Sequence, residues 1–413
     1  MKHHAIERRR FTQAVLLGAA WASPATGFAM RKNNVRTLQK TLGYLLDPSL
    51  RKKEAGDSIL EVRNVEIAGV DFGEILWRSI KFIDCDFVGA YEVKTDMEAV
   101  TFAGCRFAGV FNFGKLTSVD FVQCTARAGT FVVGGVGSKG VRFSDCTFTG
   151  TDADPNRWGG MGSYGETEFV RCKMKWANVV SETRHTIVDC DFDNVDCTVS
   201  KDGGGSEVLI EGSRLRGKFD MRPATLLSLT VRDTVLEEFD LTDATVKEGI
   251  LFERVKGGYI NAYVKEAGRL SVRNSQIFGN GTKVFEAYAG GIRAIDIDNV
   301  VFGGDLSTEP VTIAGGTGLD LANVRARVND SVVIQSSKVP RLNTHHIHTS
   351  LFQMQGCTLD SLVLSNSRIA RLELTANTIA RSADFTNTQA GESKVQPFAK
   401  GQAKLEGSNI KPR

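Results

Sequence analysis

The spacing of apolar residues in one short stretch constrains the fold most. Apolar side chains occur at Val100, Phe102, Cys105 and Phe107, in steps of two, three and two. Alternate residues of a β-strand point to the same side, and a step of three leaves room for a corner. All four side chains can then face one interior. The stretch therefore predicts a strand, a corner and a second strand that share a buried face.

Copies of this pattern recur along most of the chain. From Val62 to Phe385 the mean step is about 21.5 residues, a period typical of solenoids. The repeat predicts a single stack of about 16 rungs in place of separate globular domains. The copies begin with the pairs Leu60/Val62, Ile80/Phe82, Val100/Phe102, Val119/Phe121, Val141/Phe143, Thr167/Phe169, His185/Ile187, Val208/Ile210, Leu229/Val231, Ile250/Phe252, Leu270/Val272, Ile295/Ile297, Leu319/Leu321, Leu342/Thr344, Leu362/Leu364 and Ala383/Phe385.

A second set of apolar pairs lies about half a period after the first. It predicts two strands in each rung, and hence an all-β fold in which rungs pair in parallel at about 4.8 Å. Each inward side chain should then contact its equivalent in the next rung. The second set consists of Tyr91/Val93, Phe111/Phe113, Phe131/Val133, Cys197/Val199, Phe219/Met221, Phe239/Leu241, Phe285/Ala287, Val311/Ile313, Val332/Ile334, Phe352/Met354 and Leu372/Leu374.

Two parts of the chain, 229–248 and 362–381, divide into consecutive blocks of five residues, such as Leu362-Val-Leu-Ser-Asn. These blocks resemble those of the pentapeptide-repeat family, which place a small residue two positions before a central Leu or Phe. The resemblance covers roughly residues 60–390 and implies a right-handed, four-sided parallel β-helix. Many blocks carry Val, Leu or Ile in place of the small residue. A three-faced, pectate-lyase-like β-helix is therefore the alternative architecture.

The N-terminal end departs from the repeat. Residues 1–29 join an Arg-Arg-Arg-Phe start to a short apolar run and then to small residues, which indicates an export signal of twin-arginine type. This predicts a periplasmic or secreted protein, and the apolar run is too short to span a membrane. Apolar residues at helical spacing within 30–58 predict a short helix that caps the first rung.

Positive charge is concentrated at the two ends of the chain. The formal net charge is +3, to which residues 1–29 and the tail 391–413 contribute +3 each, so the body between them is at −3. Without a concentrated basic face, we expect no nucleic-acid partner. The near-neutral body also argues against the acidic DNA mimicry of gyrase-protecting pentapeptide proteins. The tail follows the predicted β-helix of 59–390 and is expected either to cover the last rung through Phe398 or to stay disordered.

Most of the cysteines share one position of the repeat, just after the first strand of a rung. Later rungs fill that position with Ser, Thr or Val, so it requires a small buried group and not thiol chemistry. Cys-x-x-Cys clustering is absent from the sequence, so no zinc site is predicted. Free thiols are favoured, and disulfides between neighbouring rungs are the alternative. The residues at this position are Cys85, Cys105, Cys124, Cys146, Cys172, Cys190, Ser213, Thr234, Val255, Ser275, Val300 and Val324, with Cys357 at the matching position of the other set.

A long insertion after Phe148 is the first candidate site, because loops on solenoid rungs commonly carry binding residues. Its mixture of aromatic, arginine and carboxylate side chains suits a sugar or a protein ligand. A surface loop without a function is an equally good interpretation. The candidate ligand-binding residues are Asp154, Arg157, Trp158, Tyr164 and Glu166.

A lateral patch on the second set of strands is the other candidate. Asp220 and Asp240 occupy equivalent positions of consecutive rungs, so their carboxylates should lie about 5 Å apart. β-Helical polysaccharide lyases and glycosidases use such carboxylates beside Lys or Arg, either to bind calcium or as acid and base. An ordinary solvated face is the alternative. The expected neighbours are Lys218, Arg222, Glu238, Tyr263 and Lys265.

The histidines add little to the functional argument. The repeat directs His345, His346 and His348 towards a corner or solvent, and no cysteine or carboxylate completes a metal site there. His185 occupies an inward position and is expected to be a hydrogen-bonded core residue. The sequence therefore predicts no metal and no cofactor.

Two classes of function fit these observations. The first is a non-enzymatic protein of the bacterial envelope that binds a protein or a glycan, in a scaffolding or immunity-like role. The second is a carbohydrate-active β-helix enzyme, a polysaccharide lyase or glycosidase, that uses either Asp220 and Asp240 or the loop at Arg157–Tyr164. A groove beside the two aspartates would favour the enzyme, and a flat surface would favour binding.

Overall fold

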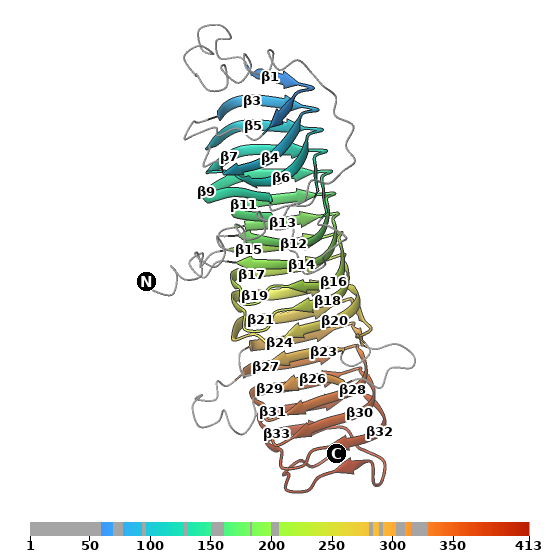
Figure 1. Cartoon of the computed structure of the whole chain (residues 1–413). Helices are drawn as coiled ribbons and strands as arrows, with labels where there is room; N and C mark the ends of the chain where they lie inside the picture. The colour runs from blue at the N-terminus through green and yellow to red at the C-terminus, as the bar shows by residue number, and fades with distance from the viewer. Residues whose placement is uncertain are drawn as a thin grey trace. The chain divides into compact units, whose positions relative to one another are not determined.

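The computed structural model (Figure 1) describes residues 59–68, 77–92, 96–127, 131–149, 161–181, 184–199, 206–280, 284–288, 292–302, 310–314 and 329–412. These residues form an all-β parallel solenoid, and no helix lies among them. The chain divides into an N-terminal unit, 1–197, and a C-terminal unit, 198–413. The export signal and the capping helix fall outside the described residues and stay predictions.

The N-terminal unit contains two ladders of parallel strands, in which each strand pairs with the next strand but one along the chain. The first ladder comprises β1 (Leu60–Arg63), β3 (Trp77–Ile83), β5 (Met97–Ala103), β7 (Leu116–Val122), β9 (Phe131–Ser144), β11 (Met161–Val170) and β13 (Arg184–Val188). The second comprises β2 (Glu66–Ala68), β4 (Asp86–Glu92), β6 (Arg106–Asn112), β8 (Thr125–Arg127), β10 (Thr147–Thr149), β12 (Lys173–Ser181) and β14 (Asp191–Val199).

A stack of phenylalanine rings fills the interior of the N-terminal unit. Neighbouring rings of Phe82, Phe102, Phe121, Phe143 and Phe169 have centroids 4.7–5.1 Å apart and planes within 12° of parallel. All five side chains are completely buried. Parallel register brings each ring onto its equivalent one rung away, as the repeat predicts. Each buried ring contributes about 1.5–3 kcal/mol of hydrophobic stabilisation.

Left-handed backbone conformations form the corners, which lie both within strands, as at Ala99 of β5 and Ser118 of β7, and between consecutive strands. Two corners of one turn lie at Ala99 and Gly104, and two corners of the next turn lie at Ser118 and Gln123, all with φ between 52° and 64°. This conformation turns the chain sharply at a single residue. The separation of five residues between corners agrees with the blocks of five found in the sequence.

The cysteines of the repeat lie directly after these corners. The Sγ–H of Cys105 donates to the carbonyl oxygen of Ala103, two residues earlier, and to that of Phe82 in the preceding turn, each at 3.6 Å. All eight cysteines are buried free thiols. Burial, with the nearby charge of Asp196, raises the pKa of Cys197 to about 12. The seven thiols other than that of Cys197 act as small buried donors to corner carbonyl groups.

His185 lies in the core as the repeat requires, but it is not hydrogen-bonded. Its ring is completely buried and lies 6.3 Å from the ring of Phe169. Neither of its nitrogens has a hydrogen-bond partner among the described residues. The ring nitrogens therefore do not meet the expectation of a hydrogen-bonded core histidine, although the ring lies beside the backbone of Thr167, the residue aligned with it on β11. Burial lowers the pKa of His185 to about 3.

The C-terminal unit repeats the two-ladder arrangement. Its first ladder comprises β15 (Glu207–Glu211), β17 (Thr225–Arg232), β19 (Thr245–Glu253), β21 (Glu266–Arg273), β24 (Ile292–Asp298), β27 (Asn329–Gln335), β29 (His348–Gln355), β31 (Arg368–Thr375) and β33 (Gln389–Val395). The second comprises β16 (Arg214–Asp220), β18 (Val235–Asp240), β20 (Lys256–Ala262), β22 (Gln276–Ile277), β23 (Phe285–Tyr288), β25 (Val301–Phe302), β26 (Pro310–Ala314), β28 (Lys338–His345), β30 (Thr358–Ser365), β32 (Thr378–Asp384) and β34 (Ala403–Lys404).

Aliphatic side chains dominate the core of the C-terminal unit. Ile250, Leu270, Ile295 and Val332 are aligned on successive strands of the first ladder and are at most 2% exposed. The position after each corner now holds mainly hydroxyl or amide side chains. Ser275 shows their role, because its Oγ donates to the carbonyl of Arg273 at 2.6 Å. The hydroxyl thus replaces the thiol as donor at the corner.

The two predicted sets of copies exchange ladders after residue 302. Val332 of β27 pairs with Ile295 in the first ladder, and Leu342 of β28 pairs with Val311 in the second. The predicted assignment of these copies is therefore wrong. The turn from Ile295 to Val332 is much longer than one period, so counting by a fixed period shifts the assignment by half a turn. The copy at Leu319/Leu321 and the corner residue Val324 fall outside the described residues, and the count of about 16 rungs stays a prediction.

The ladders continue beyond residue 390, into the segment predicted to be a polar tail. β33 extends to Val395 and pairs with β31, and β34 pairs with β32. Phe398 lies 5.7 Å from Phe385, measured between ring centroids, and Ile410 is buried. Of the two alternatives for this segment, the structure has the one in which Phe398 packs against the end of the stack.

Candidate functional site

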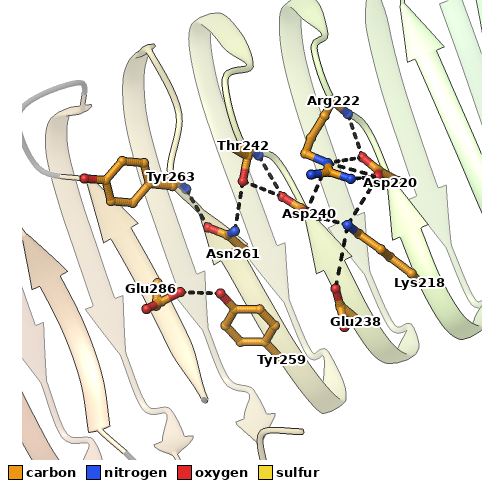
Figure 2. Close-up of polar contacts among 10 residues, drawn as sticks. All are labelled: Lys218, Asp220, Arg222, Glu238, Asp240, Thr242, Tyr259, Asn261, Tyr263 and Glu286. Atoms are coloured by element: carbon orange, nitrogen blue, oxygen red, sulfur yellow. Dashed lines mark hydrogen bonds and ion pairs between the residues drawn. The ribbon is translucent and has the colours of Figure 1, made fainter. Parts of the chain in front are cut away.

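A cluster of polar side chains covers the outer face of β16, β18, β20 and β23 in the C-terminal unit (Figure 2). Strand register aligns these residues in columns, one strand spacing of about 4.8 Å apart. The first two columns are Lys218–Glu238–Tyr259 and Asp220–Asp240–Asn261–Glu286. A third column, two residues further along each strand, contains Arg222, Thr242, Tyr263 and Tyr288. The parallel ladder thus gathers side chains that are distant in sequence.

The aspartates also end their strands. Asp220 Oδ1 accepts a hydrogen bond from the backbone N–H of Arg222 at 2.9 Å, and Asp240 Oδ1 accepts one from that of Thr242 at 2.9 Å. Asn and Asp side chains commonly make such bonds to the residue two positions on. Each carboxylate therefore satisfies a backbone donor at the corner, and its second oxygen faces the cluster.

Two cations hold the pair of aspartates together. Lys218 Nζ lies 2.8 Å from Asp240 Oδ2 and 3.3 Å from Asp220 Oδ2. Arg222 Nε lies 2.8 and 2.9 Å from the two oxygens of Asp220, and 3.3 Å from Asp240 Oδ2. The aspartate side chains are only 12% and 7% exposed. Such shielding strengthens the ion pairs relative to a fully solvated surface.

These contacts fix the charge states of two members of the cluster. Burial alone would raise the pKa of Asp220, but hydrogen bonds from Arg222 and the charges of Lys218 and Arg222 hold it below 3.8. Burial alone would lower the pKa of Lys218, but the contacts with Asp240 and Asp220 hold it above 10.5. Asp220 is therefore ionised and Lys218 protonated at neutral pH, so Lys218 is not a candidate base.

Tyr259 adds a phenol that stays protonated to the cluster. Its hydroxyl donates to Glu286, and the side chain is 5% exposed. Burial raises the pKa of Tyr259, and the contact with Glu286 raises it further. The preceding Gly258 allows β20 to approach β18, because a Cβ there would lie 1.5 Å from the carbonyl oxygen of Glu237. The glycine thus positions Tyr259 against the carboxylates.

Hydroxyl and amide groups connect the aspartates to an aromatic pair. Thr242 Oγ1 donates to Asp240 Oδ1 at 2.7 Å, and Asn261 Nδ2 donates to Thr242 Oγ1 at 2.9 Å. The backbone N–H of Tyr263 donates to Asn261 Oδ1 at 3.1 Å. The ring of Tyr263 stacks on that of Tyr288 with centroids 4.7 Å apart and an angle of 22°. The polar cluster is therefore continuous with a stacked aromatic surface.

The structure brings together most residues of the predicted lateral patch. Lys218, Asp220, Arg222 and Asp240 form its centre, and Glu238 lies 3.9 Å from Lys218 Nζ. The predicted neighbour Lys265 lies elsewhere, 4.0 Å from Asp243.

Sequence reasoning missed five members of the cluster, namely Thr242, Tyr259, Asn261, Glu286 and Tyr288. Counting one period from Glu238 reaches Tyr259, and counting one period from Asp240 reaches Asn261. The insertion before β23 hides Glu286 from such a count.

The strand end at Asp384 provides an internal comparison. Asp384 Oδ1 accepts from the backbone N–H of Thr386 at 2.9 Å and from its hydroxyl at 2.6 Å. This is the same arrangement as at Asp240 and Thr242, but the nearest cation, Lys404, is 4.0 Å away. Strand ending therefore explains the aspartates, and only the added cations and Tyr259 distinguish the cluster.

The structure describes little of the other candidate site, the insertion after Phe148. Asp154, Arg157 and Trp158 fall outside the described residues, as does the side chain of Tyr164, and Glu166 is exposed on β11.

The histidines at the end of β28 do not form a metal site. The rings of His345 and His346 lie 5.6 Å apart, measured between centroids. Within the described part of the chain, no group of three or more His, Cys, Asp or Glu side chains is arranged to hold a metal ion.

The fold and the cluster define a parallel β-solenoid with an ionisable outer face. No protein-family model matches the chain, the pentapeptide-repeat family included, and no curated protein matches it. Among solved structures, "a new PL6 alginate lyase complex with trisaccharide" is 12% identical with a TM-score of 0.33, over 89% of this chain and 95% of that chain. In the described residues, no helix has the length and apolarity needed to cross a membrane.

Proposed function

We propose that this protein is carbohydrate-active and that a polysaccharide lies along the outer face of β16, β18, β20 and β23. The observation that carries the proposal is the packing of an ionised carboxylate, two cations and a protonated phenol into one face, beside a stacked tyrosine pair. Carboxylates and amides bind sugar hydroxyl groups, and aromatic rings pack on the apolar faces of sugars. The columns repeat these groups at each strand, which suits a polymeric ligand.

The cluster also supports cleavage of the glycan by acid and base catalysis. Opposed environments hold Asp220 ionised and Tyr259 protonated, and groups whose pKa values are pushed apart are candidates for such roles. In this proposal Asp220 takes a proton from a water molecule whose oxygen bonds to the anomeric carbon, the glycosidic C–O bond breaks, and Tyr259 protonates the departing glycosidic oxygen. Lys218 positions the carboxylates. Catalytic acids and bases of this kind contribute about 10²–10⁴-fold to a rate.

A screen of purified full-length protein against a panel of polysaccharides tests the proposal. Both new reducing ends and the ultraviolet absorbance of unsaturated products are followed, so hydrolysis and elimination are both detected. We expect one polymer to be cleaved, and we expect D220N and Y259F to lower the rate at least about 100-fold.

D384N is the matched control, because Asp384 makes the same strand-ending contacts outside the cluster. It should leave the rate unchanged. Full activity of D220N and Y259F, or an equal loss in D384N, contradicts the catalytic roles.

A non-enzymatic glycan-binding surface is the second candidate. It is favoured by the ion pairs of the aspartates and by the occurrence of the same strand end at Asp384, where no cluster surrounds it. Binding of a glycan without any product, weakened by changes in the cluster, supports this candidate over the enzyme.

A further inference from the structure

We infer that the glycan bound at this face is uncharged or amino-bearing and not a polyuronate, and that Tyr263 and Tyr288 form the subsite for one of its sugar rings. The inference rests on the proposed function and names the substrate class of the same site. It is carried by two independent observations, the balance of charge in the cluster and the geometry of the aromatic pair.

Carboxylates outnumber cations in the cluster. The ten residues drawn in Figure 2 include two cations, Lys218 and Arg222, and four carboxylates. Both cations already contact Asp220 and Asp240 at the distances of ion pairs. The two further carboxylates belong to Glu238 and Glu286. A ligand on this face therefore meets net negative charge.

An anionic polymer would place its own carboxylates against this charge. Like charges juxtaposed at an interface reduce affinity and exclude partners. To bind a uronate carboxylate, Lys218 would also have to share its charge between the ligand and Asp240, which is 7% exposed and from which its Nζ lies 2.8 Å away. Weakening the ion pair of a shielded carboxylate is costly. Hydroxyl and ammonium groups of a sugar carry no such penalty, because they donate hydrogen bonds to carboxylates.

The aromatic pair presents exposed ring surface at one end of the cluster. Tyr263 and Tyr288 stack across neighbouring strands with an angle of 22°, and Tyr263 is 40% exposed. At the equivalent outward position, the other described strands of the ladder carry Arg222, Thr242, Ala314, His345, Ser365 and Thr386, none of which is a tyrosine. The pair is therefore particular to the end of the cluster at β20 and β23.

The spacing of the strands relates the subsite to the cluster. Asp240 ends β18 and Tyr263 directly follows the adjacent strand β20, and hydrogen bonds through Thr242 and Asn261 connect them. With strands about 4.8 Å apart, one oligosaccharide that runs across the ladder contacts both. A sugar on the tyrosines then places the next units of the chain over the ionised groups.

Calorimetric titration of the full chain with three hexasaccharides tests the inference. The probes are cello-hexaose, chitosan hexamer and oligogalacturonate hexamer, in moderate salt with a chelator to remove divalent cations. We expect the neutral or the amino-bearing probe to bind, and the oligouronate to bind at least about tenfold more weakly, a difference of about 1.4 kcal/mol. E238Q removes one half-buried negative charge from the cluster, and should therefore reduce the difference in affinity between the oligouronate and the other probes.

The aromatic subsite is tested with Y263A, for which we expect a loss of affinity of about tenfold. F278A is the matched control, because Phe278 has the same 40% exposure but lies at the end of β22, outside the column. Unchanged far-ultraviolet circular dichroism checks that both variants fold. Equal losses in Y263A and F278A contradict the assignment of the subsite.

The outcomes separate this inference from the proposed function. If the oligouronate binds as tightly as the other probes and Y263A weakens it, the face binds glycans but the inferred substrate class is wrong. If none of the glycans in the wider polysaccharide panel binds, the proposed function itself is wrong.

Discussion

The N-terminal and C-terminal units use the same corner with different side chains. In the N-terminal unit Cys124 donates its thiol to the carbonyl of Val122 at 3.5 Å, whereas in the C-terminal unit Ser275 donates its hydroxyl to that of Arg273 at 2.6 Å. Both bonds run from the residue after the corner to the residue two positions earlier. The comparison shows that the corner requires a small buried donor, and that sulfur or oxygen can supply it.

The two units also differ in how their outer faces distribute charge. The N-terminal unit carries isolated exposed pairs, such as Arg106 with Asp86 at 2.5 Å and Arg171 with Asp145 at 2.7 Å. The C-terminal unit instead gathers Lys218, Asp220 and Asp240 into one shielded network. Exposed pairs contribute little to stability or specificity. Only the C-terminal unit therefore has a described face with the properties of a site.

The largest expected effect is the loss of stability when a large core side chain is removed from one of the two units. Phe121→Ala removes a completely buried ring from the middle of the phenylalanine stack, and the cavity should cost about 3–5 kcal/mol of unfolding free energy. Hydrogen exchange should show the lost protection within the N-terminal unit. Leu372→Ala, a completely buried change in the C-terminal unit, is the counterpart, and its loss should be confined to that unit. Equal loss of protection in both units for either variant would contradict the expected confinement of the loss.

The second effect is the response to mild acid. The pKa of His185 is about 3 in the folded protein and about 6.5 in an unfolded chain. Between these values only the unfolded chain binds the proton, so the unfolding free energy falls as the pH drops below 6.5, by roughly 1.4 kcal/mol per pH unit. Denaturant titrations across this range should show the slope, and H185L should reduce it. H348L, an exposed position, should leave the slope unchanged.

The third effect tests the exchange of donors at the corner. Ser275 Oγ also accepts the backbone N–H of Val255 at 3.1 Å, so Ser275→Ala leaves a buried donor and a carbonyl unpaired and should cost about 1–3 kcal/mol. Cys124→Ser keeps a small donor in place and should cost less than about 1 kcal/mol. Equilibrium unfolding in urea measures both values. A greater loss in C124S than in S275A would show that the two corners are not equivalent.

The smallest effect concerns strong acid and the C-terminal unit. The pKa of Asp220 is lowered, so its contribution is fully present above the unfolded value of about 3.8 and is lost as the pH falls through the lower folded value. D220N should therefore have a flatter pH dependence of stability below about pH 4. Parallel curves for D220N and the unchanged protein, measured by urea unfolding, would show that the cations do not stabilise the ionised form.

Much of the fold follows from the sequence because a solenoid is periodic. Phe82, Phe102 and Phe121 follow one another at intervals of one repeat, and parallel register then requires their rings to stack. The same arithmetic aligned Asp220 with Asp240. It failed between Ile295 and Val332, because an insertion of irregular length removes the fixed period on which it depends.

The sequence by itself determined the repeat, the inward positions and the small residue after each corner. These depend only on local spacing and on the contact between equivalent residues of consecutive turns. The tertiary structure decided which outward side chains meet. Tyr259 and Glu286 lie 27 residues apart and contact each other only because an insertion returns the chain to the adjacent strand. The spacing of residues likewise does not encode the burial of the His185 ring or the ion pair between Lys218 and Asp240, because these depend on packing and charge.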